Sequence, residues 1–401
     1  MKPLFKKCLF SLATFCFCLG GLELLLKELG YEGTSIVDLV DTSGFHENAY
    51  VHRRDRILGD WYIKKGELYH SNPELLSRGF HNNTFQSSDN IIYAIGGSTT
   101  YGSPFEHQEK GFSERLEKLL KGKHKIINTG VAGMDSSSFP SLAKQLSSIG
   151  GHGVIIYTGN NELQGALLRK CATPPSQFQR FKMYQLILDL QRRYHNTQYQ
   201  FNALAEHQED CIDRALLETL KQSPADVSSI RSDPFYETLK HTFRENLLQS
   251  IERFREAGLH IWLVIPPINL LERPTFSIPD PALSPEDRLS VLMYSKEKRW
   301  AEILRIDPNH AQANYEIGRI PPYDFNKLRI AAERDYRSRR LTWGLQDILL
   351  QLCKERDVVC VDLRDQEKKS ELFFHDFCHP TQQYGVQTIA QALYTHIIGS
   401  K

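Results

Sequence analysis

Two polar blocks, far apart in the chain, hold residues whose types and spacing could do chemistry. The first is Gly96-Gly97-Ser98-Thr99, in which the glycines allow a tight turn that exposes the serine hydroxyl. The other is Asp376-Phe377-Cys378-His379, where a carboxylate three residues before a histidine can place both side chains on one side of a turn. A carboxylate that orients an imidazole for a serine hydroxyl is the arrangement that nucleophilic acyl transfer requires.

Two further blocks lie between them in the chain. The segment Asn128-Thr129-Gly130-Val131-Ala132-Gly133 has glycines that let a backbone N–H approach a ligand, and Thr158-Gly159-Asn160-Asn161-Glu162 offers side-chain amides. Taken singly, each block is as typical of a plain turn as of a site. Their ordered occurrence at successive strand ends favours a functional site.

The elements that must position these blocks alternate between strands and helices. Apolar runs predict strands at 91–95, 125–128, 154–157, 260–265 and 358–363. Helical spacing and capping signals predict helices at 112–120, 136–149, 235–257, 334–356 and 380–398. This alternation indicates an α/β fold, in which helices cover both faces of a parallel sheet. Ligands gather at the carboxyl ends of such strands, where three of the four blocks lie.

Two stretches, 163–234 and 268–332, do not fit the alternation and are interpreted as helical insertions into a domain that spans 90–401. Within the second, Trp300 to Gly318 resembles the junction of two tetratricopeptide repeats, with an Asp-Pro-Asn turn between two helices. A repeat array needs about three units to bury its faces. Because Pro321-Pro322 ends the pattern after one unit, we expect a helical hairpin and no peptide-binding superhelix.

The N-terminal segment, 1–27, is expected to be an uncleaved signal anchor, followed by a membrane-proximal connector at 28–89. Three lysines precede an apolar run from Cys8 to Leu26, which contains Glu23 as its one charge. A helix of this length spans about 28 Å, close to the hydrocarbon core of a bilayer. The positive-inside rule then predicts a single-pass protein of the cell membrane with an extracytoplasmic (periplasmic or extracellular) catalytic domain. A cleaved signal peptide and a buried helix of a soluble protein are the alternatives.

Composition excludes several classes of protein. The chain has 401 residues, and 49 Lys and Arg against 48 Asp and Glu leave a net charge of +1, which does not indicate a nucleic-acid partner. Charged residues at 24% and hydrophobic residues at 41% exclude a mostly disordered chain. The eight cysteines include no C-x-x-C pair and no His/Cys cluster with metal-ligand spacing, so the sequence predicts no metal.

Several other residues are weighed as candidates and set aside. His375 adjoins the aspartate but lacks a carboxylate three residues before it. Arg339-Arg340 could bind an anionic substrate, although a solvated face of the predicted helix is the favoured interpretation. Trp300 and Tyr315 are interpreted as core residues. Cys378 could form a disulfide with Cys353 or Cys360, or remain a buried free thiol.

The four blocks in this order resemble the SGNH/GDSL hydrolase superfamily, named for a Ser, a Gly, an Asn and a His. Ser98, Gly133, Asn161 and the pair Asp376 and His379 match its blocks, over about 91–162, 235–267 and 333–398. The anchor and the tetratricopeptide-like fragment further resemble a membrane-anchored bacterial subgroup. Two departures are Gly-Gly-Ser-Thr in place of Gly-Asp-Ser-Leu, and Glu162 where Asp is common, which should affect loop hydrogen bonding more than chemistry.

The resemblance implies a three-layer α/β/α, flavodoxin-like sheet and a serine esterase that needs no cofactor. Ser98, Asp376 and His379 would form the catalytic triad. The backbone N–H groups of Ser98 and Gly133 and the side-chain amide of Asn161 would form the oxyanion hole. The substrate would be an O-acyl ester of a cell-envelope polysaccharide or lipid. An O-acyltransferase on the same scaffold, and a catalytically silent anchored scaffold, are the alternative functions.

Overall fold

The computed structural model describes residues 20–25, 28, 61–64, 67–70, 90–102, 111–130, 133–172, 234–280, 282–341, 344–356 and 358–399. Its centre is a five-stranded sheet built from β3 (Ile91–Gly96), β4 (Lys125–Asn128), β5 (Gly153–Tyr157), β6 (His260–Ile265) and β7 (Val359–Asp362). Neighbouring strands are parallel throughout, so the prediction of an α/β fold with a parallel sheet is confirmed.

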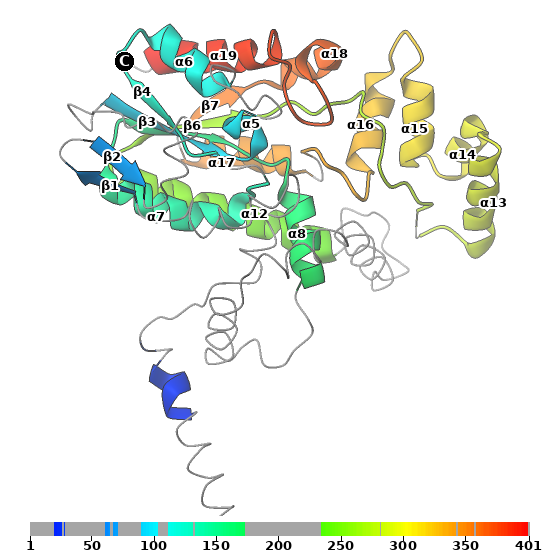
Figure 1. Cartoon of the computed structure of the whole chain (residues 1–401). Coiled ribbons are helices and arrows are strands. Elements are labelled where there is room, and N and C mark those ends of the chain that lie inside the picture. Colours follow the sequence, from blue (N-terminus) through cyan, green and yellow to red (C-terminus); the bar gives the residue numbers. More distant parts are fainter. Residues whose placement is uncertain are drawn as a thin grey trace, which may run out of the picture.

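The strands lie in the order β4-β3-β5-β6-β7 (Figure 1). Counted along the chain, this is the order 2-1-3-4-5 of flavodoxin-like doubly wound sheets. In such sheets ligands bind where the strand order reverses, outside the carboxyl ends of the first and third strands. Here those strands are β3 and β5, so Ser98 and Asn161 both follow strands at the switch point.

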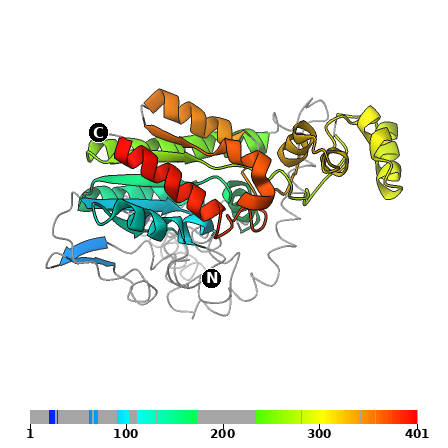
Figure 2. The ribbon, with the colours of Figure 1, turned by 90° about the horizontal axis from the view of Figure 1, so that it is seen from above.

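Helices cover both faces of the sheet and give the three layers that the resemblance implied (Figures 1 and 2). One face packs against α6 (Phe112–Leu120) and α19 (Gly385–Gly399). The other packs against α7 (Phe139–Ile149), α12 (Pro234–Glu256) and α17 (Leu345–Arg356). Successive residues of a strand point to opposite faces. Accordingly, on β3, Ile91, Tyr93 and Ile95 point toward α7, α12 and α17. Ile92 and Ala94 point toward α6 and α19.

The insertion at 268–332 contains helices α13 (Pro285–Lys296), α14 (Trp300–Ile306), α15 (Ala311–Gly318) and α16 (Phe325–Glu333). They project to one side of the sheet, with α16 nearest to it and α13 outermost (Figures 1 and 2). Val291, Ile303 and Ala313 form a small separate core for the outer helices. The predicted helix–turn–helix at Trp300–Gly318 is therefore present, and Trp300 and Tyr315 are half-buried against apolar neighbours.

The largest departure from the predicted helices lies at 334–356. The sequence predicts a helix over 334–356, but α17 begins only at Leu345. The side chain of Asp335 accepts hydrogen bonds from the backbone N–H groups of Thr275, Phe276 and Arg337. Such side-chain-to-backbone bonds compete with a helix. Residues 334–341 are therefore irregular and tied to the insertion, and Arg340 among them is buried instead of solvated.

The N-terminal third is described only in part. The anchor prediction falls mostly outside the described residues, and in the ranges that are described no helix is long and apolar enough to cross a membrane. Within the predicted connector, β1 (Trp61–Lys64) and β2 (Glu67–His70) form an antiparallel hairpin that the sequence did not indicate. Of the insertion predicted at 163–234, the structure describes α8 (Glu162–Ala172), and 173–233 lies outside the described residues.

The remaining short elements all lie near the ends of the sheet strands. They are α5 (Ser98–Tyr101), η2 (Ser136–Ser138), η4 (Arg364–Lys369) and α18 (Ser370–Phe373).

Candidate active site

Ser98 is the first residue of α5, directly beyond the carboxyl end of β3. Tyr101 N–H donates to the Gly97 carbonyl, which closes the turn around the serine. Gly96 has φ of 155°, and a side chain there would overlap the Tyr157 carbonyl of the neighbouring strand. Glycine is therefore required for the sharp strand-to-helix turn that brings the Ser98 hydroxyl to the sheet edge.

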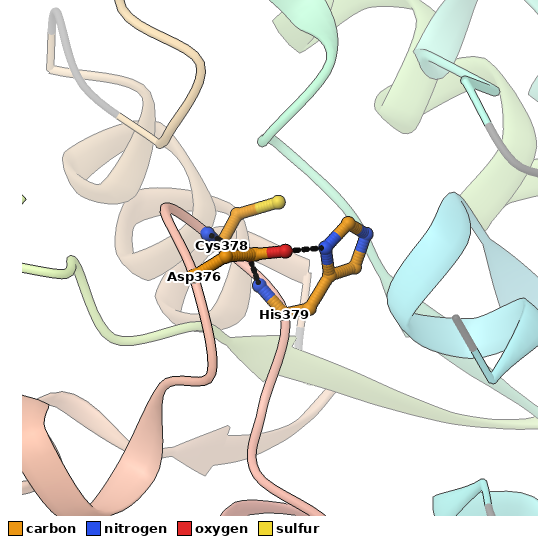
Figure 3. A group of neighbouring side chains, drawn as sticks. All are labelled: Asp376, Cys378 and His379. Carbon is orange, nitrogen blue, oxygen red and sulfur yellow. Dashed lines mark hydrogen bonds and ion pairs between the residues drawn. The ribbon is translucent and has the colours of Figure 1, made fainter. Parts of the chain in front are cut away.

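Asp376 and His379 lie in a tight turn after α18. The Asp376 carboxylate accepts backbone N–H bonds from Cys378 at 3.0 Å and from His379 at 2.8 Å, as Figure 3 shows. The His375 N–H donates to the His379 carbonyl at 2.8 Å, and Phe374 and Pro380 form an isolated antiparallel β-bridge across the turn. These bonds bring the Asp376 carboxylate to the imidazole of His379, as the three-residue spacing predicts.

The structure brings Ser98, His379 and Asp376 into one chain of hydrogen bonds. His379 Nε2 lies 2.8 Å from Ser98 Oγ, and His379 Nδ1 lies 2.7 Å from Asp376 Oδ2. A carboxylate can only accept here, which assigns the imidazole proton to Nδ1 and leaves Nε2 to accept from the serine hydroxyl. Burial of Asp376 opposes its ionisation, but hydrogen bonds from His379 and Cys378 outweigh this and lower the pKa of the carboxyl.

Asn161 lies beside the serine turn, after the carboxyl end of β5. Its Nδ2 donates to the Met134 carbonyl at 2.9 Å, and the amide nitrogen carries a second N–H. A Cβ on Gly97 would lie only 2.4 Å from this nitrogen, so the absence of a side chain there lets the amide approach the Ser98 turn. Gly133, with φ of 79°, immediately precedes Met134, and the Asn161–Met134 bond therefore holds the glycine block near the asparagine block.

Glu162 provides a second connection between these two blocks. Glu162 is buried, and its carboxylate accepts three hydrogen bonds. The donors are the Ser136 backbone N–H at 2.9 Å, the Ser136 hydroxyl at 2.8 Å and the Thr158 hydroxyl at 3.2 Å. All three bonds are made within the loops that carry Gly133 and Asn161. This agrees with the expectation that the departure from Asp affects loop hydrogen bonding.

Other candidates from the sequence have different environments. Cys378 is buried with a free thiol, as are Cys353 and, less deeply, Cys360, so the disulfide alternatives for Cys378 are not formed. The guanidinium of Arg339 lies 5.8 Å from the centre of the Phe377 ring, which in turn contacts the His379 ring edge-on. Arg339 therefore lies near the histidine and is not on a helix, contrary to the sequence prediction.

One cluster of possible metal ligands is found among the described residues. It consists of Asp376, Cys378 and His379, whose potential ligand atoms lie within 4.8 Å of one another (Figure 3). The donors fit acid–base chemistry better than a metal. Burial, and then the charge of Asp376, raise the pKa of the Cys378 thiol well above its usual value, so it is a protonated thiol and a poor ligand. His379 Nδ1 and Asp376 Oδ2 already share a proton in a hydrogen bond of 2.7 Å.

Sequence reasoning missed Asn269, which lies four residues beyond β6 and contacts the Asp376 turn. Its Nδ2 donates to the Asp376 carbonyl at 2.7 Å. The one available signal was its place after the carboxyl end of a predicted strand, the location that drew attention to the other polar blocks.

Comparisons with known proteins give distant structural likenesses. No family model matches, and no curated protein matches. A GDSL-like lipase from Bacteroides thetaiotaomicron is 10% identical, with 78% of this chain and 89% of that chain covered and a TM-score of 0.34. The acetyl xylan esterase AlAXEase is 11% identical, with 77% and 99% covered and a TM-score of 0.36.

The acetylxylan esterase Axe2 from Geobacillus stearothermophilus is 12% identical, with 78% of this chain and 95% of that chain covered and a TM-score of 0.35. All three of these proteins are named as esterases or lipases. Likeness at this level is weak, so the function proposed below rests on the geometry of the site.

Proposed function

We propose that this chain is a serine esterase that hydrolyses O-acyl esters. The single observation that supports this most is the hydrogen-bonded series Ser98–His379–Asp376 at the carboxyl edge of the sheet. A serine hydroxyl is a weak nucleophile unless a base takes its proton, and a base held by a carboxylate is the recurrent solution. The Asn161 amide beside the serine turn adds a donor for the charge that develops on the substrate.

In the proposed reaction, Ser98 Oγ attacks the ester carbonyl while its proton passes to His379 Nε2. Asp376 stabilises the resulting imidazolium and keeps the ring oriented. The oxyanion is stabilised by the backbone N–H groups of Ser98 and Gly133 and by the Asn161 amide; removal of one such donor typically costs about 3 kcal/mol of transition-state stabilisation.

The proton on His379 then moves to the departing alcohol as the ester C–O bond breaks. A water molecule, deprotonated by His379, attacks the acyl-serine, releases the carboxylic acid and restores the Ser98 hydroxyl. Delivery of a sugar hydroxyl in place of water at this second step would make the same site an O-acyltransferase.

The proposed substrates are acylated glycans or lipids of the cell envelope, and the proposed location is the outer side of the cytoplasmic membrane. Support comes from the sequence, in which Lys2, Lys6 and Lys7 precede the apolar run from Cys8 to Leu26.

A fluorophosphonate probe tests the proposal, because it labels only an activated serine. We expect labelling of the native protein and of Ser290→Ala, which removes an exposed hydroxyl on α13 bonded to the Glu286 carbonyl. Ser98→Ala should lose labelling and lose aryl acetate hydrolysis by roughly 10⁴-fold or more. Labelling that persists in Ser98→Ala would contradict the assignment.

A further inference from the structure

Asn269 connects the start of the helical insertion to the Asp376–His379 turn. It is almost fully buried, and its side chain uses both of its polar ends. Nδ2 donates to the Asp376 carbonyl at 2.7 Å, and Oδ1 accepts from the Leu271 backbone N–H at 3.1 Å. One side chain therefore shapes its own loop and holds the peptide group of Asp376.

The loop that carries Asn269 is itself held by Arg340. This arginine is buried, and its Nη1 donates to the Asn269 carbonyl and, at 2.7 Å, to the Glu272 carbonyl. The Asp335 carboxylate lies 3.8 Å from Arg340 Nη2, so the buried guanidinium has a charged partner. One Arg340 nitrogen that donates to two carbonyls of a short loop restrains that loop more than a single bond would.

We propose that Asn269, supported by Arg340, is a positioning residue that sets the orientation of Asp376 toward His379. The inference rests on the proposed esterase function. Both ends of Asp376 are then constrained: its carboxylate accepts N–H bonds from Cys378 and His379, and its carbonyl accepts from Asn269. Without the last bond, the peptide that follows Asp376 can rotate and carry the carboxylate away from the imidazole.

Catalysis depends steeply on such alignment, because a displacement of about 1 Å remote from the reacting atoms can lower the rate about a hundredfold. Loss of one neutral hydrogen bond corresponds to a smaller effect, about tenfold in rate. The start of the insertion, 268–272, therefore acts on the site where Asn269, supported by Arg340, meets the Asp376 turn.

Asn269→Asp keeps the Oδ1 acceptor for Leu271 and replaces the donor to the Asp376 carbonyl with an acceptor, but it also adds a negative charge. Asn269→Ala, which removes the donor without adding a charge, is therefore measured beside it, and native kcat in Asn269→Ala also overturns the proposal. We expect kcat for an aryl acetate to fall about tenfold, with KM within about twofold. The downfield ¹H NMR resonance of the proton between His379 Nδ1 and Asp376 should shift or broaden. Arg340→Lys retains a charge near Asp335, but its side chain is one atom shorter and does not place a nitrogen at the position of Nη1 between the two carbonyls. It should give the same signature with a smaller loss.

Tyr315→Phe is the matched control. The Tyr315 hydroxyl donates to the Leu271 carbonyl at 3.0 Å, so this variant also removes one bond between the insertion and the loop, without touching Asp376. It should change kcat and the resonance much less than Asn269→Asp does, because the bond from Asn269 to the Asp376 carbonyl remains.

Native kcat in Asn269→Asp, or an equal loss in Tyr315→Phe, overturns the proposal. If Asn269→Asp does not fold, the kcat and resonance of Arg340→Lys decide, and native values there overturn it. Turnover that survives in Ser98→Ala overturns the proposed function instead, and the resonance still reports separately on the Asn269 contact.

Discussion

Two histidines in different parts of the molecule are both almost fully buried, yet their surroundings give them opposite properties. His379, at the sheet edge, has an exposed fraction of 8%, and His310, in the helical insertion, 3%. His379 Nδ1 bonds the Asp376 carboxylate and its Nε2 bonds the Ser98 hydroxyl. His310 Nδ1 instead accepts the Ala313 backbone N–H at 3.2 Å and caps the start of α15.

The difference lies in the partner of Nδ1. An aspartate stabilises the protonated ring, so His379 can take up a proton during a reaction. A backbone N–H can bond only an unprotonated nitrogen, and burial lowers the pKa of His310 to about 4. Buried histidine is therefore no sign of a site by itself; the group that faces each ring nitrogen decides between a base and a helix cap.

The largest expected effect separates the two histidines by activity. His379→Gln removes the proposed base, and kcat/KM for an aryl acetate should fall by roughly 10⁴-fold or more. The free energy of unfolding should change by only about 1 kcal/mol, the scale of one hydrogen bond. Kinetics together with urea unfolding measure both quantities.

His310→Ala is the matched control for that comparison. It should keep kcat/KM close to native while the free energy of unfolding falls by about 2 kcal/mol, through loss of a helix cap and of a buried ring. Loss of activity in a folded His310→Ala protein, or substantial activity in His379→Gln, would reverse the roles assigned to the two residues.

How much of the structure the sequence predicts depends on whether an element is fixed by local or by distant contacts. Strands β3, β4 and β6 and helix α6 lie within a residue of their predicted bounds, because continuous apolar runs or helical spacing end at glycine, proline or polar residues. The segment before α17 was misassigned because its conformation depends on Asp335, whose bonds reach Thr275 and Phe276 about 60 positions away.

In the candidate site, the residues that the sequence singles out are those with a local pattern. Ser98, Asp376 and His379 each belong to a short block with a turn signal, and the structure brings these three together. Asn269 and Arg340 have no such signal, because their roles come from bonds to carbonyls in other segments. Carbonyl groups occur at every position, so their partners cannot be identified from residue type.

A second prediction concerns the stability that the folded protein loses in acid through His310. The unfolded chain binds a proton at the ordinary histidine pKa of about 6.5, whereas the folded chain binds it only at about 4. Between these values the unfolded state holds more protons, so stability is complete above about pH 6.5 and declines as the pH falls. The full loss would be about 3 kcal/mol. Urea unfolding between pH 7 and pH 4 measures it.

Asp307, in the same turn, acts in the opposite direction. Burial raises the pKa of its carboxyl, although N–H bonds from Asp280 and Asn309 partly offset this. A raised carboxyl pKa means that the folded state takes up the proton first, which adds stability as the pH falls. A net pH dependence of the native protein therefore understates the contribution of His310, and a variant that removes only the imidazole is needed.

His310→Asn is that variant, and its effect at neutral pH is the smallest expected here. Asparagine is a good helix N-cap, so its side-chain oxygen can accept the Ala313 N–H in place of the imidazole. The free energy of unfolding at pH 7 should therefore fall by only about 1 kcal/mol, from lost ring packing. Below pH 6.5 the variant should lose less stability than the native protein, and the difference between the two curves isolates His310. Parallel curves from pH 7 to pH 4 would show that His310 does not titrate on unfolding, and that its cap does not depend on a neutral ring.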